Sequence, residues 1–392
     1  MKTSDQAFIT PSVFRWAIAR AKSTPEKLAK KLHTARASVA GWEQGKSLPT
    51  FSQAQKAAEA LYIPFGYLFL PAPPDETIPL TDFRTTPGKR IPPSAELIDL
   101  VNDVLFKQQW YREFLLAQGA RPLPFVGSFS ARQAASPIAD SIRKTLAIDA
   151  NLRQQCNGWN ELFVALIRNV EAAGILVMRS GVALANTHRK LSVKEFRGFA
   201  ISDPIAPVIF VNGKDWPKAQ LFTVAHELVH IWIGTSGISN ENLRGIGDVN
   251  NIERLCNEVA AEVLVPASEF RDLWSDPATI SENLDQIVRH FRVSTLVALR
   301  RAFDLQKISR DEYLRLYTRE ERAFREIREQ RKGGGNFYNN VLARNSATLT
   351  KALVQGATRG TVLYRDAARL LNISAPAVQK IARHLAKQKE RA

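Results

Sequence analysis

The stretch that decides the fold in the middle of this chain reads FTVAHELVHIW, residues 222–232. It is an apolar run with two histidines and a glutamate, and it predicts a packed helix. His226 and His230 are four residues apart, so both imidazoles leave one face of the helix and can reach one zinc ion. Glu227 is turned by about 100° around the axis, which puts its carboxylate beside the metal and not on it.

The spacing of these three residues predicts chemistry as well as structure. Zinc lowers the pKa of a bound water to about 7, and a neighbouring carboxylate can take the proton as that water attacks a carbonyl. The pattern therefore indicates metal-assisted hydrolysis of a peptide bond, with Glu227 as the general base. Two histidines on an apolar helix can also be buried, hydrogen-bonded residues without a metal. A third protein ligand would favour the zinc site.

A second predicted helix, residues 252–265, offers that ligand. Its small and aliphatic residues form a packed face, and a proline follows it. In one register Glu253 is the zinc ligand, and Asn257, one turn later, orients another ligand by a hydrogen bond. In the other register Glu258 is the ligand and Glu262 lies behind it. Spacing alone leaves both registers open.

Four stretches together resemble the ImmA/IrrE-type zinc metallopeptidases: residues 197–201, 207–212, 222–230 and 253–266. In that family the third ligand is a Glu followed four residues later by Asn or Asp, and then by small residues ending in Pro. The resemblance selects Glu253 over Glu258, and it implies a zincin-like domain that binds Zn²⁺ through Glu253 and the two histidines. Val229 and Val259 depart from the family's usual residues, but both are packing positions.

The formal charge of +16 is concentrated at the two ends of this 392-residue chain. Residues 1–72 hold 10 Lys and Arg against 4 Asp and Glu, and residues 281–392 hold 23 against 11. Residues 73–280 hold 21 against 23 and are close to neutral. A catalytic domain between nucleic-acid-binding parts has this distribution. Helical surfaces whose charges only keep them solvated have it too.

Cysteine usage and hydropathy indicate the compartment. Cys156 and Cys256 are the only cysteines, which argues against a disulfide framework and for a reducing environment. Residues 1–7 lack the apolar core of a signal peptide, and no run approaches the roughly 18 apolar residues of a membrane span. We therefore expect a soluble, cytoplasmic protein with no membrane partner.

Residues 11–70 predict a bundle of short helices. The helix expected over 24–32 begins with an N-cap and a proline. A turn at His33 and Thr34 separates it from a second short helix over 35–45. Two short helices joined by so tight a turn describe a helix-turn-helix, whose second helix enters the DNA major groove.

This bundle resembles the Cro/repressor-type (XRE) domains. The residues that carry the resemblance are Leu28, Ala29, Val39, Trp42, Glu43, Gly45 and Pro49. Ala35 and Ala37 depart from the family, because groove-facing positions there are more often polar. Base readout is expected mainly from Arg36 and Ser38, and a phosphate contact from Lys46. We expect such a domain to bind an inverted repeat in double-stranded DNA as a homodimer.

Three predicted strands form a small sheet: residues 174–179, 199–202 and 208–212. The last of these precedes the zinc helix, and we expect an extended substrate peptide to pair with it and to present its carbonyl to the metal. The substrate strand so defined consists of Val208, Ile209, Phe210, Val211 and Asn212. Residues 78–84 alternate apolar and polar side chains and can add an edge strand.

The expected domains are a helix-turn-helix domain (1–72), a proline-rich linker or arm (73–93), a zinc peptidase domain (94–280), a helical region (281–332) and a C-terminal helical unit (333–392). The fold class is α+β, mainly α, with an N-terminal helix-turn-helix bundle, a central zincin-like domain and a helical C-terminal region. Residues 333–335 predict a hinge. Turns at 290–294 and near 372–375 also look like helix-turn-helix turns, and the first is better interpreted as a hairpin covering the zinc domain.

The resemblance implies a DNA-binding transcriptional regulator with a zinc metalloendopeptidase domain. Such a protein cuts a repressor or partner protein in a stress, phage or toxin-antitoxin response. The alternative is a non-proteolytic repressor or antitoxin whose zinc domain binds a toxin partner or an effector. Glu227 beside the zinc ligands favours the enzyme, because a module that only binds partners does not need that carboxylate.

Overall fold

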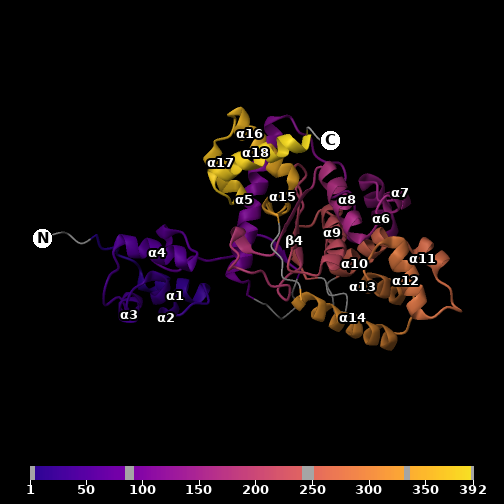
Figure 1. Ribbon diagram of the computed structural model, residues 1–392, viewed down its shortest axis with the longest axis horizontal. Coiled ribbons are helices and arrows are strands. Elements are labelled where there is room, and N and C mark those ends of the chain that lie inside the picture. Colours follow the sequence, from indigo (N-terminus) through magenta and orange to yellow (C-terminus); the bar gives the residue numbers. More distant parts are fainter. Residues whose placement is uncertain (1–4, 84–91, 241–250, 331–335, 390–392) are drawn as a thin grey trace. The chain divides into compact units, whose positions relative to one another are not determined.

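The computed structural model describes four parts of the chain, residues 5–83, 92–240, 251–330 and 336–389. They belong to two compact units, residues 1–78 with 92–98 and residues 79–91 with 99–392 (Figure 1). The predicted hinge at 333–335 lies outside the described residues. The predicted domain boundaries stay predictions.

Short helices build the N-terminal unit: α1 (Pro11–Arg20), α2 (Pro25–Leu32), α3 (Arg36–Gln44), α4 (Phe51–Leu61) and the 3₁₀ helix η1 (Phe65–Phe69). Thr24 caps α2 by accepting a hydrogen bond from the Lys27 N–H at 3.3 Å. His33 ends α2 in the left-handed conformation, with φ 52°. The chain then turns into α3, whose Val39 and Trp42 are buried in the core of the bundle. The two helices and the tight turn match the predicted helix-turn-helix.

The second unit is mainly helical. Its helices are α5 (Ala95–Ala117, which begins in the first unit), α6 (Ala135–Leu146), α7 (Ala150–Gln154), α8 (Trp159–Ala172), η2 (Ala183–Ala185), α9 (Pro217–Trp232), α10 (Asn251–Leu264), α11 (Ala267–Leu273), α12 (Ile280–Phe291), α13 (Thr295–Asp304), α14 (Arg310–Gln330), α15 (Phe337–Asn345), α16 (Ala347–Arg359), α17 (Tyr364–Leu371) and α18 (Ala375–Lys389). The fold is therefore α+β and mainly α, as predicted.

A small mixed sheet accompanies these helices. Its strands are β1 (Thr81–Asp82), β2 (Leu176–Ser180), β3 (Gly198–Ile201), β4 (Val208–Asn212) and β5 (Gly237–Ser239). Their order is β1-β5-β3-β4-β2. Strand β3 is antiparallel to β4 and β5, whereas β1 is parallel to β5 and β2 is parallel to β4. The predicted edge strand is confirmed as β1.

The predicted substrate strand is wrong in its role. Strand β4 lies between β3 and β2, and it pairs with β2 along its whole length, from Val208 beside Leu176 to Asn212 beside Ser180. Strand addition needs a sheet edge with unpaired N–H and C=O groups. Because both sides of β4 are paired, a substrate peptide cannot add to Val208, Ile209, Phe210, Val211 and Asn212.

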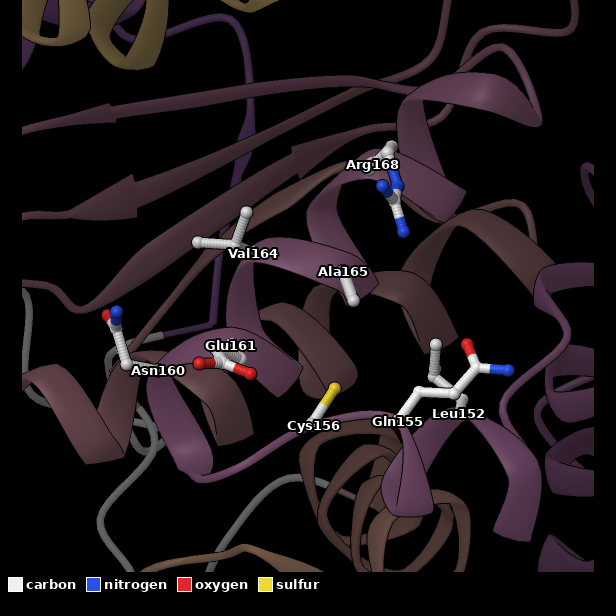
Figure 2. Close-up of a pocket in the computed structure, with 8 residues that line it drawn as sticks. All are labelled: Leu152, Gln155, Cys156, Asn160, Glu161, Val164, Ala165 and Arg168. Carbon is white, nitrogen blue, oxygen red and sulfur yellow. The ribbon is translucent and has the colours of Figure 1, made fainter. Parts of the chain in front are cut away.

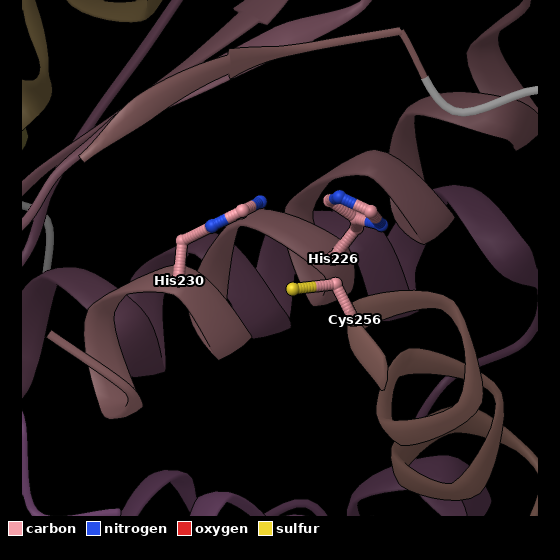
Figure 3. Close-up of side chains that lie close together, drawn as sticks. All are labelled: His226, His230 and Cys256. Atoms are coloured by element: carbon pink, nitrogen blue, oxygen red, sulfur yellow. The ribbon is translucent and has the colours of Figure 1, made fainter. Parts of the chain in front are cut away.

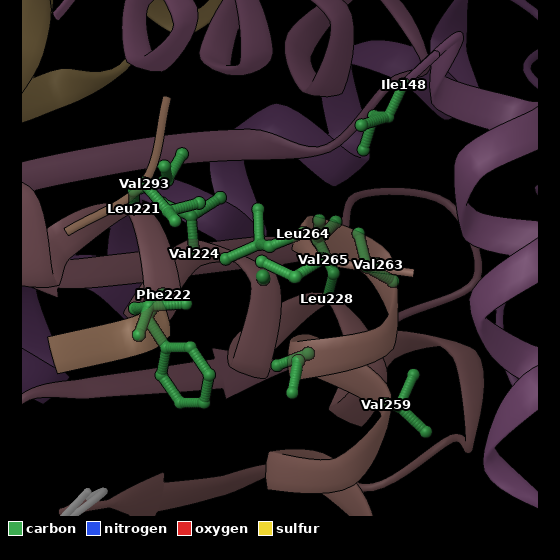
Figure 4. Packing of buried hydrophobic residues seen from close by; sticks show 14 of the residues in the cluster. Ile148, Leu221, Phe222, Val224, Leu228, Val259, Val263, Leu264, Val265 and Val293 are labelled. Carbon is green, nitrogen blue, oxygen red and sulfur yellow. The ribbon is translucent and has the colours of Figure 1, made fainter. Parts of the chain in front are cut away.

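Helix α9 runs through the main core. Its residues from Gln220 to Trp232 are buried, and it packs against α10 and the sheet strands β3 and β4. Leu228 lies in one apolar cluster with Val263 and Leu264 of α10 (Figure 4). Burial on all sides explains why the segment is apolar around its whole circumference.

Helices from two later segments, α12–α13 and α15–α18, complete the unit. Helix α13 carries buried apolar residues that belong to the same core as α9, which agrees with a hairpin that covers the domain. Helix α15 packs against β2, which is the last strand at one side of the sheet. The C-terminal helices are therefore part of the second unit.

Candidate metal centre

Helix α9 brings His226 and His230 to one face, one turn apart (Figure 3). Both side chains are fully buried, and their ring centroids are 5.2 Å apart. Pro217 occupies the first turn of the helix, where its missing N–H costs nothing. The predicted helix and the predicted shared face are both present.

A hydrogen bond at Nδ1 orients each ring. His226 Nδ1 lies 3.1 Å from Asn257 Oδ1 on α10, and His230 Nδ1 lies 3.0 Å from Thr235 Oγ1 in the segment after α9. The Nε2 atoms face Glu253, at 3.3 Å for His226 and 3.2 Å for His230. Asn257 thus occupies the position that the sequence predicted for it. Thr235 was not predicted.

Glu253 is 4% exposed in the first turn of α10. Burial alone raises the pKa of its carboxyl group, but the adjacent His226 and His230 outweigh burial and lower that pKa to about 2. Burial also lowers the pKa of His230, which favours the neutral imidazole that a metal needs. The carboxylate and the neutral ring are the protonation states of metal ligands.

The alternative register places its glutamates elsewhere. Glu258 is exposed on α10. Glu262 accepts hydrogen bonds from the Arg301 guanidinium and, at 3.1 Å, from the Ala267 N–H. Of the glutamates weighed in the two registers, Glu253 is the one that reaches both histidines.

Glu227 is completely buried one position after His226. The hydroxyl of Ser239 on β5 donates a hydrogen bond to its Oε1. Gly198 of β3 lies directly opposite, and a Cβ atom there would come within 2.6 Å of the same oxygen. The sheet therefore fixes this carboxylate next to the histidines and leaves space for it only because residue 198 is glycine.

Cys256 is a further group at this centre that was not predicted to act there. Ligand atoms of His226, His230 and Cys256 all lie within 4.8 Å of one another, and Cys256 is completely buried (Figure 3). It follows Glu253 by three residues, so both leave the same face of α10. Cysteine thiolates bind zinc, and the spacing of three residues from Glu253 is a signal that could have placed Cys256 at this centre.

Phe83, directly after β1, lies over His230. The two rings are stacked, with centroids 5.3 Å apart and an interplanar angle of 16°. The Phe83 N–H donates to the Ile238 carbonyl at 3.0 Å, which continues the pairing of β1 with β5. The segment that contains β1 thus contributes an aromatic wall to the centre.

The residues present fit a metal ion. His230 Nε2 and Glu253 Oε1 are buried, and neither has a hydrogen-bond partner within the described ranges, although they are 3.2 Å apart. Buried polar atoms without hydrogen bonds are costly, and a divalent cation between these atoms would compensate that cost. Two imidazoles and a carboxylate are also a known catalytic zinc set.

A cavity of about 290 Å³ elsewhere in the unit involves none of these groups (Figure 2). It is lined by residues of α7, α8 and their connection, among them Cys156, Glu161 and Arg168. None of the predicted site residues lines it.

The predicted DNA-contacting residues lie on and just after α3. Arg36 is exposed and forms an ion pair of 2.6 Å with Glu26 of α2. Ser38 is partly exposed in the first turn of α3, and Lys46 is exposed after its end. All three are accessible from solvent in this unit.

Comparison with known proteins agrees with the description of the metal centre and of the N-terminal helix-turn-helix. Residues 170–303 match the IrrE N-terminal-like domain of the peptidases, residues 15–68 match a helix-turn-helix domain, and residues 345–384 match a domain of unknown function. The radiation response metalloprotease IrrE of Deinococcus deserti is 33% identical over 101 residues, which are 25% of this chain and 36% of that protein. The chain thus matches only about a third of that relative's length.

These matches confirm the two resemblances inferred from the sequence. The chain joins an XRE-type helix-turn-helix domain to a domain that is similar to the IrrE N-terminal-like domain. In the described ranges, no helix combines the length and the apolar composition that crossing a membrane requires.

Proposed function

We propose that this chain, a helix-turn-helix domain joined to an IrrE-like peptidase domain, is a transcriptional regulator whose central domain is a zinc-dependent endopeptidase. The observation that carries the proposal is the convergence of two histidine Nε2 atoms on the Glu253 carboxylate, with Glu227 fixed beside them. The substrate is proposed to be a repressor or another partner protein.

His226, His230 and Glu253 would hold the zinc ion. When bound, zinc supplies a Lewis acid that polarises a peptide carbonyl and makes a water molecule more acidic. Asn257 and Thr235 keep the two imidazoles in the orientation that leaves Nε2 to the metal. Asn257 is therefore a positioning residue.

Glu227 is the proposed general base. It takes the proton from the attacking water, and the same carboxyl group can deliver a proton to the leaving amine. Ser239 hydrogen-bonds to one carboxylate oxygen and so fixes its orientation. In this scheme, the ligands determine metal binding and Glu227 determines turnover.

The N-terminal domain is proposed to bind an inverted repeat in duplex DNA as a homodimer. Arg36 and Ser38 would contact bases and Lys46 a phosphate. Proteolysis by the same chain, or by a second copy, would then change which genes are transcribed. The alternative, an antitoxin or repressor that does not cut, uses the same DNA contacts but does not need Glu227.

The test is Glu227→Gln in cells that carry the full chain, with Glu258→Gln as the matched control, since Glu258 is exposed on α10. Loss of a general base lowers turnover by about 10²- to 10⁴-fold. New protein N-termini should appear with wild type and with Glu258→Gln, and should be absent with Glu227→Gln, while zinc content stays unchanged. If Glu227→Gln regulates its genes as wild type does, the non-proteolytic alternative is correct.

A further inference from the structure

Helices α17 and α18 repeat the backbone geometry of α2 and α3. Each first helix has eight residues and ends at a left-handed residue, His33 with φ 52° and ψ 45° and Asn372 with φ 52° and ψ 50°. In each pair the next N–H returns to the first helix, Thr34 to the Ala29 carbonyl and Ile373 to the Ala368 carbonyl, both at 3.0 Å. The C-terminal pair is therefore a helix-turn-helix in backbone terms.

The turn alone does not identify a DNA-binding element. Arg292 ends α12 in the same left-handed conformation, with φ 56°, and Ser294 caps α13. Yet α13 is packed into the core through Leu296, Val297 and Ala298 among others, so it cannot enter a groove. The accessibility of the second helix is what separates the two cases.

Helix α18 has an accessible and basic face. Val378 and Ile381 are buried, whereas Lys380, Arg383 and Lys387 are exposed. The spacing of three and then four residues places these cations along one side of the helix. None of the three has an ion-pair partner among the residues that the structure describes.

The charge of the surrounding unit has the same sign. Residues 336–389 contain 9 Lys or Arg residues and 1 acidic residue, Asp366. A domain with this excess and a free cationic helix face has the electrostatic character of a nucleic-acid-binding module. Duplex DNA carries closely spaced negative phosphates along each strand, and a row of cations on one helix face can pair with several of them.

The residues at the start of α18 indicate what is contacted. Ala375 and Ala377 stand at the helix positions that Arg36 and Ser38 occupy in α3. Alanine offers no hydrogen bond to a base edge, while the cations lie further along the helix and reach phosphates. We infer that the C-terminal unit binds the phosphate backbone of double-stranded DNA through α18, without reading its sequence.

The unit is held firmly to the peptidase domain. Asn372 donates to Asp103 of α5 at 2.9 Å, and Arg369 lies over the Phe106 ring at 5.3 Å. Glu171 of α8 accepts hydrogen bonds at the start of α16, from the Ser346 hydroxyl and, at 3.0 Å, from the Ala347 N–H. A duplex bound by α18 would therefore lie on the same compact unit as the metal centre.

The test uses the full chain with Lys380→Ala, Arg383→Ala and Lys387→Ala combined. A matched control removes three exposed cations that lie in the same compact unit but outside its C-terminal helices, Arg121, Arg132 and Lys144. Binding to two duplexes of unrelated sequence is measured by fluorescence anisotropy between about 50 and 200 mM salt. Three lost phosphate contacts should lower the slope of log K against log salt by about 2 to 3, equally for both duplexes.

The control variant should leave that slope within about one unit of the wild type. A photo-crosslinking residue at Gln379 of α18 should crosslink to the duplex, and one at the exposed Gln355 of α16 should not. Single-stranded RNA and anionic vesicles are titrated alongside the duplexes. The inference is wrong if the two triple variants behave alike, if Gln379 does not crosslink, or if the triple variant of α18 loses binding to the RNA or the vesicles but not to the duplexes. An equal loss of affinity for both duplexes does not depend on base readout by Arg36. Failure of the proposed DNA contacts of the N-terminal domain can therefore be distinguished from failure of this inference.

Discussion

The metal centre and the helix pair α2–α3 are both marked by short local patterns, but they are built in opposite ways. At the metal centre, α9 is buried from Gln220 to Trp232, and groups from α10 and β5 orient its side chains. On α3, Arg36 is 73% exposed and its partner in an ion pair is Glu26 of the adjacent helix. Substitutions at the first region should therefore act almost all-or-none, and those at the second should be graded and sensitive to salt.

The largest effect is expected for Glu253→Ala. Loss of an outer hydrogen-bond partner alone lowers metal affinity by about 10- to 100-fold, so loss of a ligand should lower zinc affinity by more than about 100-fold. Glu258→Ala, on the exposed side of the same helix, should retain zinc. The zinc content of both purified variants, measured by metal analysis, decides between the two registers. Full zinc content in Glu253→Ala with loss in Glu258→Ala would establish the other register.

A methyl group at Gly198 tests how tightly the sheet closes on Glu227. The added Cβ would lie 2.6 Å from Glu227 Oε1 and 3.0 Å from the Phe210 carbonyl. Overpacking of this kind costs about 1 to 3 kcal/mol of unfolding free energy. Gly66→Ala in the N-terminal unit meets no atom within 4 Å and should change it by less than about 0.5 kcal/mol. Calorimetric unfolding of both variants measures the difference, and equal effects would contradict it.

Arg36→Ala should weaken operator binding in a sequence-dependent way. Loss of a bidentate base contact costs about 1 to 3 kcal/mol and relaxes preference at that base pair. Selection of bound sequences from a random duplex pool, followed by affinity measurement, gives both quantities. An unchanged operator preference would remove Arg36 from base readout.

The smallest effect is expected for Lys46→Ala. One lost phosphate contact should lower the slope of log K against log salt by about 0.9 and weaken binding to all sequences alike. A salt titration of binding to operator and to unrelated DNA measures it. If only operator binding falls, Lys46 contacts a base.

The local patterns predicted much of this structure. The His226 to His230 spacing requires only a helix, and the turn at His33 requires only two short helices, so both followed from neighbouring residues. Strand β4 was located correctly, but its place inside the sheet depends on pairing with residues 176–180, which spacing along the chain does not encode.

The groups that surround the metal centre were harder to predict. Thr235, Ser239 and Phe83 reach it from a loop, a short strand and an arm that no motif connects with α9. Cys256 could have been placed near the site, since it follows Glu253 by one turn of the same helix. Helix periodicity thus predicts which side chains of a single helix lie together at the site. The site residues from other elements are brought there by tertiary packing, which the periodicity does not encode.

The packing of α15 on β2 has a consequence for shortened chains. Strand β2 is the last strand on its side of the sheet, and α15 packs against it. Ending the chain before Phe337 would remove α15 and leave β2 as a strand edge open to pairing with other chains, a known route to aggregation. Such a truncation would lose solubility together with the basic helices, so lost DNA binding would not report on α18. Point substitutions keep the sheet edge protected and so report on DNA contacts alone.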